Sequence, residues 1–166
     1  MPTAQAHIEH AQHNINFLEK FIEGIEERKF NDWAITVAFY ACVHIIEAII
    51  FRKKDLTYNG QNIRIENSDE LPTAASKANI PPPENLTWTM KLNHKFRNML
   101  TSENFPDIRE QYDYLYKQSR TARYRFYKYD DKDVDLILKY APTHIIDWAN
   151  KNFDLNLKVT KKILKP

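Results

Sequence analysis

The sequence predicts an all-α protein, an antiparallel up-and-down bundle of four long helices followed by a kinked fifth. Apolar residues recur at three- and four-residue spacing over most of the 166 residues, which is the period of a helix face. Only two glycines occur, which fits long helices and disfavours the glycine-rich loops that hold phosphates. The segment from Asp32 to Phe51 is almost entirely apolar, as expected of a buried central helix.

The first helix is expected from Gln5 to Arg28. One apolar stripe predicts it, formed by Ile8, Ala11, Ile15, Leu18, Ile22 and Ile25. His7, His10 and His13 lie three apart on the same helix, but their directions diverge and they need a partner helix to meet. We expect them to face solvent, and we predict no metal and no cofactor.

The second helix is expected from Asp32 to Phe51, with Asn31 or Asp32 as its N-terminal cap. It is long and apolar enough to cross a membrane. His44 and Glu47 near its middle would be costly in lipid, so we expect a core helix and no membrane contact.

Residues 55–83 are expected to form an irregular insertion or flap. The run Tyr58-Asn59-Gly60-Gln61 contains the Asn-Gly pair that is typical of a tight hairpin turn. The run Pro81-Pro82-Pro83 ends the segment, because proline is not tolerated inside a helix. Loops of this length inside a small domain are often functional, so a lid is one interpretation.

The third and fourth helices are expected over residues 84–102 and 106–127, with Pro106 in the first turn of the fourth. The predicted core positions of the third helix are Trp88, Leu92, Phe96 and Met99. Those of the fourth helix are Ile108, Leu115, Ala122 and Phe126. His94 and Arg97 lie opposite the core stripe of the third helix, so we expect them in solvent.

Asp130 or Asp131 is expected to cap a fifth helix that runs through Asn150 and is kinked at Pro142. The lysine-rich tail, residues 154–166, is expected to fray.

The length of the chain fits one domain, over residues 1–153, before this tail. The net charge of +2 permits nucleic-acid binding without requiring it. The single cysteine, Cys42, excludes an intrachain disulfide, and the first 13 residues carry no signal-peptide pattern, so we expect a cytoplasmic protein.

Two helices carry a polar stripe beside their apolar face, each within about 80° around the helix. On the second helix the stripe consists of Thr36, Tyr40, His44 and Glu47. On the fourth helix it consists of Tyr112, Tyr116, Arg120, Arg123 and Tyr127, flanked by Ser119 and Tyr124. Two interpretations stay open: a structural network in which Glu47 pairs with these arginines, or an anion and RNA-phosphate site with His44 as a titratable group.

The same stripes resemble the small prokaryotic HEPN-domain proteins, over roughly residues 4–150. The resemblance rests on Asp32-Trp33-Ala34, on Phe39-Tyr40-Ala41-Cys42-Val43-His44-Ile45-Ile46-Glu47-Ala48, and on Tyr116-x-x-Ser119-Arg120-x-Ala122-Arg123-Tyr124. It implies a helical bundle that forms a homodimer and acts on RNA. It also implies a toxin–antitoxin or phage-defence setting, with a partner such as a nucleotidyltransferase-like antitoxin. Many HEPN proteins are metal-independent ribonucleases that use an arginine followed, after four to six residues, by a histidine.

That ribonuclease motif is absent, because no arginine here has a histidine at the required spacing. A substitute catalytic site would combine Arg120 and Arg123 with Tyr40 and with His44 or His94. The residues expected to bind substrate beside it are Glu47, Tyr116, Ser119, Tyr124, His94 and Arg97. The alternative is a non-catalytic HEPN-like interaction or antitoxin-type module whose Glu–Arg–Tyr stripes are structural.

Overall fold

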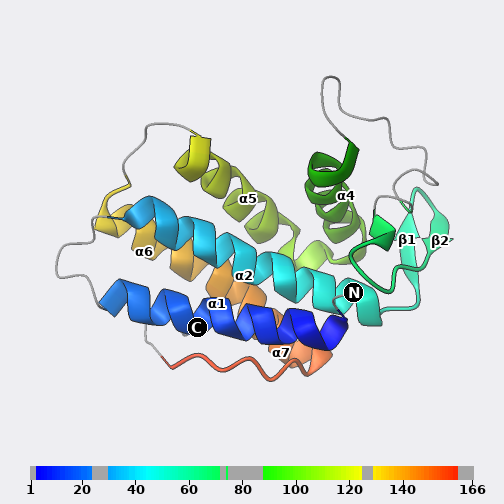
Figure 1. The fold of residues 1–166 in the computed structure, drawn as a ribbon, viewed down its shortest axis with the longest axis horizontal. Helices are drawn as coiled ribbons and strands as arrows, with labels where there is room; N and C mark the ends of the chain where they lie inside the picture. The colour runs from blue at the N-terminus through cyan, green and yellow to red at the C-terminus, as the bar shows by residue number, and fades with distance from the viewer. Residues whose placement is uncertain (1–2, 24–29, 72–73, 75–87, 125–128, 161–166) are drawn as a thin grey trace.

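The computed structural model describes residues 3–23, 30–71, 74, 88–124 and 129–160, and these are mostly helical, so the all-α class is confirmed (Figure 1). The elements, in chain order, are α1 (Ala4–Glu23), α2 (Asn31–Arg52), β1 (Leu56–Tyr58), β2 (Gln61–Ile63), α4 (Trp88–Asn104), the 3-10 turn η1 (Pro106–Ile108), α5 (Arg109–Tyr124), α6 (Asp131–Tyr140) and α7 (Pro142–Phe153).

The apolar helix α2 lies at the centre of the fold. It runs antiparallel to α1 and contacts α4, α5, α6 and α7 as well. Most of its side chains are buried, and Phe39, Ile45, Ile46 and Ile49 are fully buried. Within the described part of the chain, α2 is the helix that has the length and apolarity to cross a membrane. Its burial inside the protein is that of a core helix.

The start of α2 differs from the sequence prediction. The residue before the helix is Phe30, and no side chain caps the helix there. Asn31 instead donates from its Nδ2 atom to the Tyr129 carbonyl oxygen at 2.8 Å and to Asp131 Oδ1 at 3.0 Å. The expected Asn31 cap is therefore wrong, because this amide ties the start of α2 to the start of α6.

The hairpin expected at Asn59-Gly60 is present. Both turn residues have positive φ, 50° and 73°, which is the conformation that makes Asn-Gly a favoured hairpin turn. Strands β1 and β2 pair antiparallel, with Leu56 opposite Ile63. Asn104 at the end of α4 holds the hairpin, since it exchanges hydrogen bonds with the Thr57 backbone at 2.8 Å. The rest of the predicted insertion is described only for residues 64–71 and 74, so its proline run lies outside the described residues.

The later helices follow the predicted order with shifted ends. Helix α4 continues to Asn104, and the start predicted for it at residue 84 lies outside the described residues. Pro106 opens a 3-10 turn before α5 begins at Arg109. Asp130 is the cap of α6, because its side chain accepts a hydrogen bond from the Asp133 N–H at 2.8 Å. The predicted kink at Pro142 is a break, since α6 ends at Tyr140 and α7 begins at Pro142.

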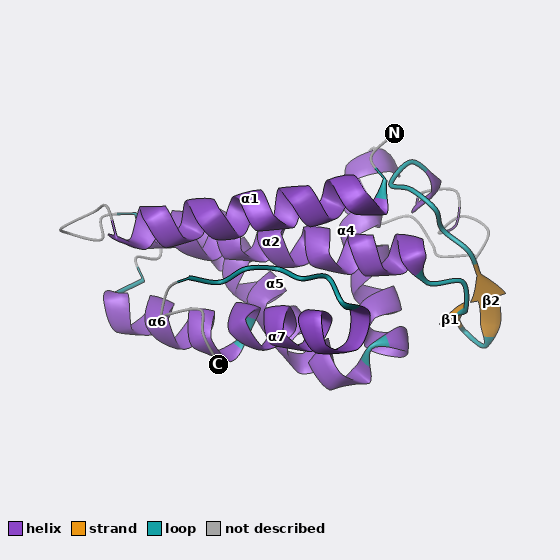
Figure 2. Cartoon of the chain, turned by 90° about the horizontal axis from the view of Figure 1, so that it is seen from below, coloured by secondary structure: helices purple, strands orange, loops and turns teal. Residues whose placement is uncertain are grey.

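Residues 154–160 form a strap that runs back from the end of α7 along α1 (Figure 2). Leu155 and Leu157 are buried in the core. The Lys158 N–H donates to Gln12 Oε1 at 2.7 Å, and the Thr160 N–H donates to Glu19 Oε1 at 2.7 Å. The prediction that the chain frays after Phe153 is therefore wrong as far as residue 160, because two leucines and these side-chain bonds dock it.

Candidate functional site

A cleft of about 1210 Å³ opens between α4 and α5, the green and yellow-green helices at the top of Figure 1. Among the described residues, its lining carries four cations and one carboxylate: Lys95, Arg109, Arg120, Arg123 and Glu103. Tyrosines and one histidine share the same wall: Tyr40, Tyr58, Tyr116, Tyr124 and His94. This surface, called the basic cleft below, combines positive charge with aromatic rings.

Arg123 is held in place by aromatic rings and by oxygen atoms without a formal charge. Its Nη1 donates to the Tyr40 hydroxyl at 3.0 Å, and its Nε donates to the Ser119 carbonyl oxygen at 3.1 Å. The guanidinium carbon lies 5.6 Å from the ring centroids of Phe39 and Tyr40 and 5.3 Å from that of Tyr124. Among the described residues, no carboxylate lies within ion-pair distance of Arg123. An oriented guanidinium without such a partner is suited to bind an anion.

The outer part of the basic cleft is exposed. Arg120 lies over the ring of Tyr116, with 5.8 Å between its guanidinium carbon and the ring centroid. Tyr124 is 74% exposed, so a large aromatic face is open to solvent beside the arginines. Ser119 is fully buried, and its hydroxyl donates to the Tyr116 carbonyl oxygen at 2.9 Å. Ser119 therefore shapes α5 beneath Arg123 and does not itself reach a ligand.

His94 lines the basic cleft and is partly buried against Phe39. Its Nδ1 accepts a hydrogen bond from Arg97 Nη1 at 3.0 Å, which places the ring proton of the neutral imidazole on Nε2. Burial, the charge of Arg97 and the charge of Arg123 lower the pKa of His94 to about 4. At neutral pH this side chain is an uncharged hydrogen-bond donor.

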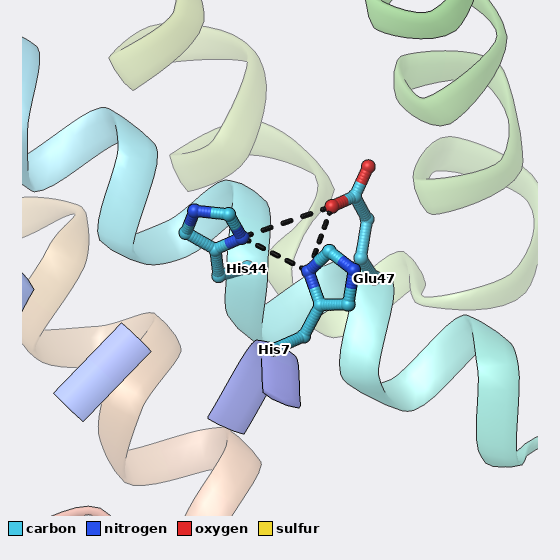
Figure 3. A group of neighbouring side chains, drawn as sticks. All are labelled: His7, His44 and Glu47. Carbon is cyan, nitrogen blue, oxygen red and sulfur yellow. Dashed lines mark hydrogen bonds and ion pairs between the residues drawn. The ribbon is translucent and has the colours of Figure 1, made fainter. Parts of the chain in front are cut away.

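Behind the cleft, Glu47 is the centre of a buried polar network formed by His7, His44, Glu47, Arg97 and His94. Its Oε1 accepts from Arg97 Nη2. Its Oε2 lies 3.0 Å from His7 Nδ1 and 3.8 Å from His44 Nδ1 (Figure 3). Glu47 and Arg97 are only 5% and 4% exposed. Burial raises the pKa of Glu47, but the hydrogen bond from His7 and the charge of Arg97 outweigh it and hold that pKa at about 2. Burial lowers the pKa of His44 to about 4, which the Glu47 charge only partly offsets.

The structure thus divides the polar stripe of α2 between two places. Tyr40 contacts Arg123 at the basic cleft as expected, whereas Glu47 pairs with Arg97 and not with Arg120 or Arg123. Tyr40 and Glu47 are seven residues apart, or roughly 10 Å along a helix axis, so they meet different neighbouring helices. His44 lies beside Glu47 and His7, and it is absent from the lining of the basic cleft.

Two expectations about solvent exposure are wrong. Arg97 is buried because it is the ion-pair partner of Glu47. His7 is also buried, at 4% exposed, and its Nδ1 lies 2.9 Å from His44 Nδ1. The sequence did contain a signal for His7, since it precedes Ala11 by four residues and so extends the core stripe of α1 by one turn.

No family model, curated protein or solved structure matches the chain. The residues that resemble HEPN motifs fall into both places described above. Tyr40, Arg120 and Arg123 line the basic cleft, and His44 and Glu47 belong to the buried polar network.

The lowered pKa of His94 predicts acid sensitivity. Between about pH 6.5 and pH 4 the unfolded chain binds a proton at this residue and the folded chain does not, so folding stability falls as the pH falls through this window. We expect His94→Gln, which cannot titrate but can still accept from Arg97, to remove roughly 1–3 kcal/mol of this loss. Urea unfolding at pH 7.5 and pH 4.5 measures the loss of folding stability between the two pH values. Equal acid losses in the variant and the parent would contradict the prediction.

Proposed function

We propose that this protein is a HEPN-like, RNA-directed effector that holds the phosphate backbone of single-stranded RNA in the basic cleft. The observation that carries the proposal is Arg123, whose guanidinium is oriented by Tyr40 and Ser119 and has no carboxylate partner among the described residues. In the part of the chain that the structure describes, three further cations line the same cleft, against one carboxylate. Such a surface attracts phosphates by charge and by paired hydrogen bonds.

The aromatic side chains favour RNA over a small anion. Single-stranded nucleic acid is commonly bound by a basic groove in which bases stack on aromatic rings. Tyr116 and Tyr124 offer such rings beside Arg120 and Arg123. The cleft volume of about 1210 Å³ also exceeds the roughly 300–1,000 Å³ typical of a small-molecule pocket.

Binding without cleavage fits the geometry best. His94 is the histidine among the described residues that line the cleft. A histidine that takes the proton of a 2′-hydroxyl needs a free ring nitrogen. Here Arg97 occupies Nδ1, and Nε2 carries the proton. His94 is therefore suited to donate a hydrogen bond to a phosphate, and we expect RNA to remain intact.

The non-catalytic HEPN-like interaction or antitoxin-type module is the second candidate. The Glu47–Arg97 pair favours this candidate, because a buried ion pair that joins α2 to α4 stabilises the fold and is not open to a ligand. The exposed arginines of α5 favour RNA. The HEPN resemblance further implies a homodimer and a nucleotidyltransferase-like antitoxin partner, and we include both in the proposal.

The test is fluorescence anisotropy with a short labelled single-stranded RNA, in EDTA. We expect Arg120→Gln to weaken binding about tenfold, or about 1.4 kcal/mol, and to reduce the slope of log affinity against log salt by about 1. Arg120 is exposed, so the variant should fold normally.

The matched control is Arg64→Gln, which removes the same charge from an exposed arginine that is absent from the cleft lining. It should bind RNA like the parent protein. No RNA binding by the parent, or equal losses in the two variants, would refute the proposed function. Gel analysis of the same RNA reports cleavage. RNA fragments that form with the parent protein, but not after substitution of His94, would contradict the proposal that the cleft binds RNA without cutting it.

A further inference from the structure

We propose that His7, His44 and Glu47 form a binding site for a divalent cation of the zinc class, which would join α1 to α2. His7 comes from α1, and the other two residues come from successive turns of α2. Figure 3 shows the three side chains pointing toward one another. Their facing atoms, Nδ1 of both histidines and Oε2 of Glu47, are separated by 2.9, 3.0 and 3.8 Å.

These separations form an irregular face of a coordination tetrahedron: a regular face has three edges of about 3.3 Å, whereas here the edge from His44 to Glu47 is longer, at 3.8 Å, and the other two are shorter. The circle through the three atoms has a radius of about 1.9 Å. A zinc ion with bonds of about 2.0–2.1 Å to nitrogen and oxygen therefore fits roughly 0.7 Å out of their plane. That height is one third of the bond length, which is the value for a regular tetrahedron. Three protein ligands leave the fourth position to water, as in many zinc sites.

The three facing atoms can share either a proton or a cation. Three hydrogen-bond acceptors meet when both Nδ1 atoms are unprotonated and Glu47 is ionised. Either a proton on His7 Nδ1 or a cation relieves that repulsion. Ser68 accommodates both states, because its hydroxyl lies 3.1 Å from His7 Nε2 and is able to donate to that nitrogen or accept from it. With a cation bound, the Nε2–H donates to Ser68, which is the usual outer contact of a metal-bound histidine.

The donor set selects the kind of cation. Two imidazoles and one carboxylate suit zinc and its transition-metal neighbours, whereas magnesium and calcium prefer oxygen ligands throughout. Arg97 orients the carboxylate through Oε1 and leaves Oε2 facing the histidines. Its charge also repels a cation, so we expect weaker binding than at a site with a free carboxylate. His44 is only half-buried and adjoins the exposed ring of His10, which gives an ion a route from solvent.

The first experiment is isothermal titration of the metal-free protein with zinc chloride. We expect one Zn²⁺ per chain, and a rise in Tm of roughly 5–10 °C at a hundredfold excess over Kd. His44→Gln should weaken zinc binding at least tenfold, since even outer contacts of a metal site are worth that much. The matched control is His10→Gln, which removes a neighbouring exposed histidine outside the cluster and should leave the affinity unchanged.

A cobalt spectrum of the parent protein makes the test independent of how the variants fold. Co²⁺ in this site should give the intense visible absorption of four-coordinate cobalt. A weak six-coordinate spectrum, no zinc binding by the parent, or equal losses in His44→Gln and His10→Gln would each overturn the proposal. RNA binding in EDTA is measured without metal, so failure of this site and failure of the basic cleft are separate results.

Discussion

Arg97→Ala should cost about 3–5 kcal/mol of folding stability, measured by urea unfolding of the metal-free protein at pH 7.5. The substitution leaves the Glu47 carboxylate buried without its charged partner, and removing one side of a buried ion pair typically costs this much. The substitution also removes one of the causes that hold the pKa of Glu47 at about 2, whereas the hydrogen bond from His7, which lowers the same pKa, remains. We expect a steep fall in the urea midpoint at an unchanged slope.

The chain offers a matched exposed pair as the control. Arg64 and Glu66 form an ion pair at 2.7 Å on the surface, and Arg64→Ala should cost no more than about 1 kcal/mol. Adding Glu47→Gln to the Arg97→Ala variant should recover part of the loss, because a neutral amide replaces the unpaired charge. Equal costs for Arg97→Ala and Arg64→Ala would show that burial does not set the strength of the Glu47–Arg97 pair.

The sequence predicted those parts of the fold that depend on near neighbours in the chain. Helical periodicity placed α2 within one residue of its observed ends, and Asn59-Gly60 located the hairpin turn. A helix cap depends on which partner the side chain finds. Asn31 does not cap α2, because its amide donates to Tyr129 and Asp131, about a hundred residues further along the chain.

The candidate site was predictable as a set of residues but not as a set of pairs. The sequence named Tyr40 and Arg123, and the structure brings them together at 3.0 Å. The sequence favours a pairing of Glu47 with the arginines of α5, because Arg97 lies opposite the predicted core stripe of α4 and is expected in solvent. The packing of α4 against α2 instead pairs Glu47 with Arg97. Helical periodicity gives the face of a helix on which a residue lies, but not the angle at which two helices cross. The pairing of Glu47 with Arg97 therefore follows only from the structure.

The docked strap makes the second large prediction. Leu157→Ala should cost roughly 2–5 kcal/mol, the usual range for removing a buried leucine side chain. The strap sits at the edge of the fold, so the cost cannot exceed the free energy that docks residues 154–160, because beyond that value the strap detaches by local unfolding. Urea unfolding gives the total cost.

Amide hydrogen exchange then separates a docked strap from a frayed one. The N–H groups of Lys158 and Thr160 donate to Gln12 and Glu19 on α1, so both should be protected in the parent protein. Leu157→Ala should accelerate exchange at both amides while the amides within α2 stay protected. Lys158→Ala serves as the control, since it removes an exposed side chain, keeps the backbone bond to Gln12 and should cost less than about 0.5 kcal/mol. Fast exchange of both amides in the parent protein would show that residues 154–160 are frayed, as the lysine-rich sequence predicts, and would contradict the docked strap.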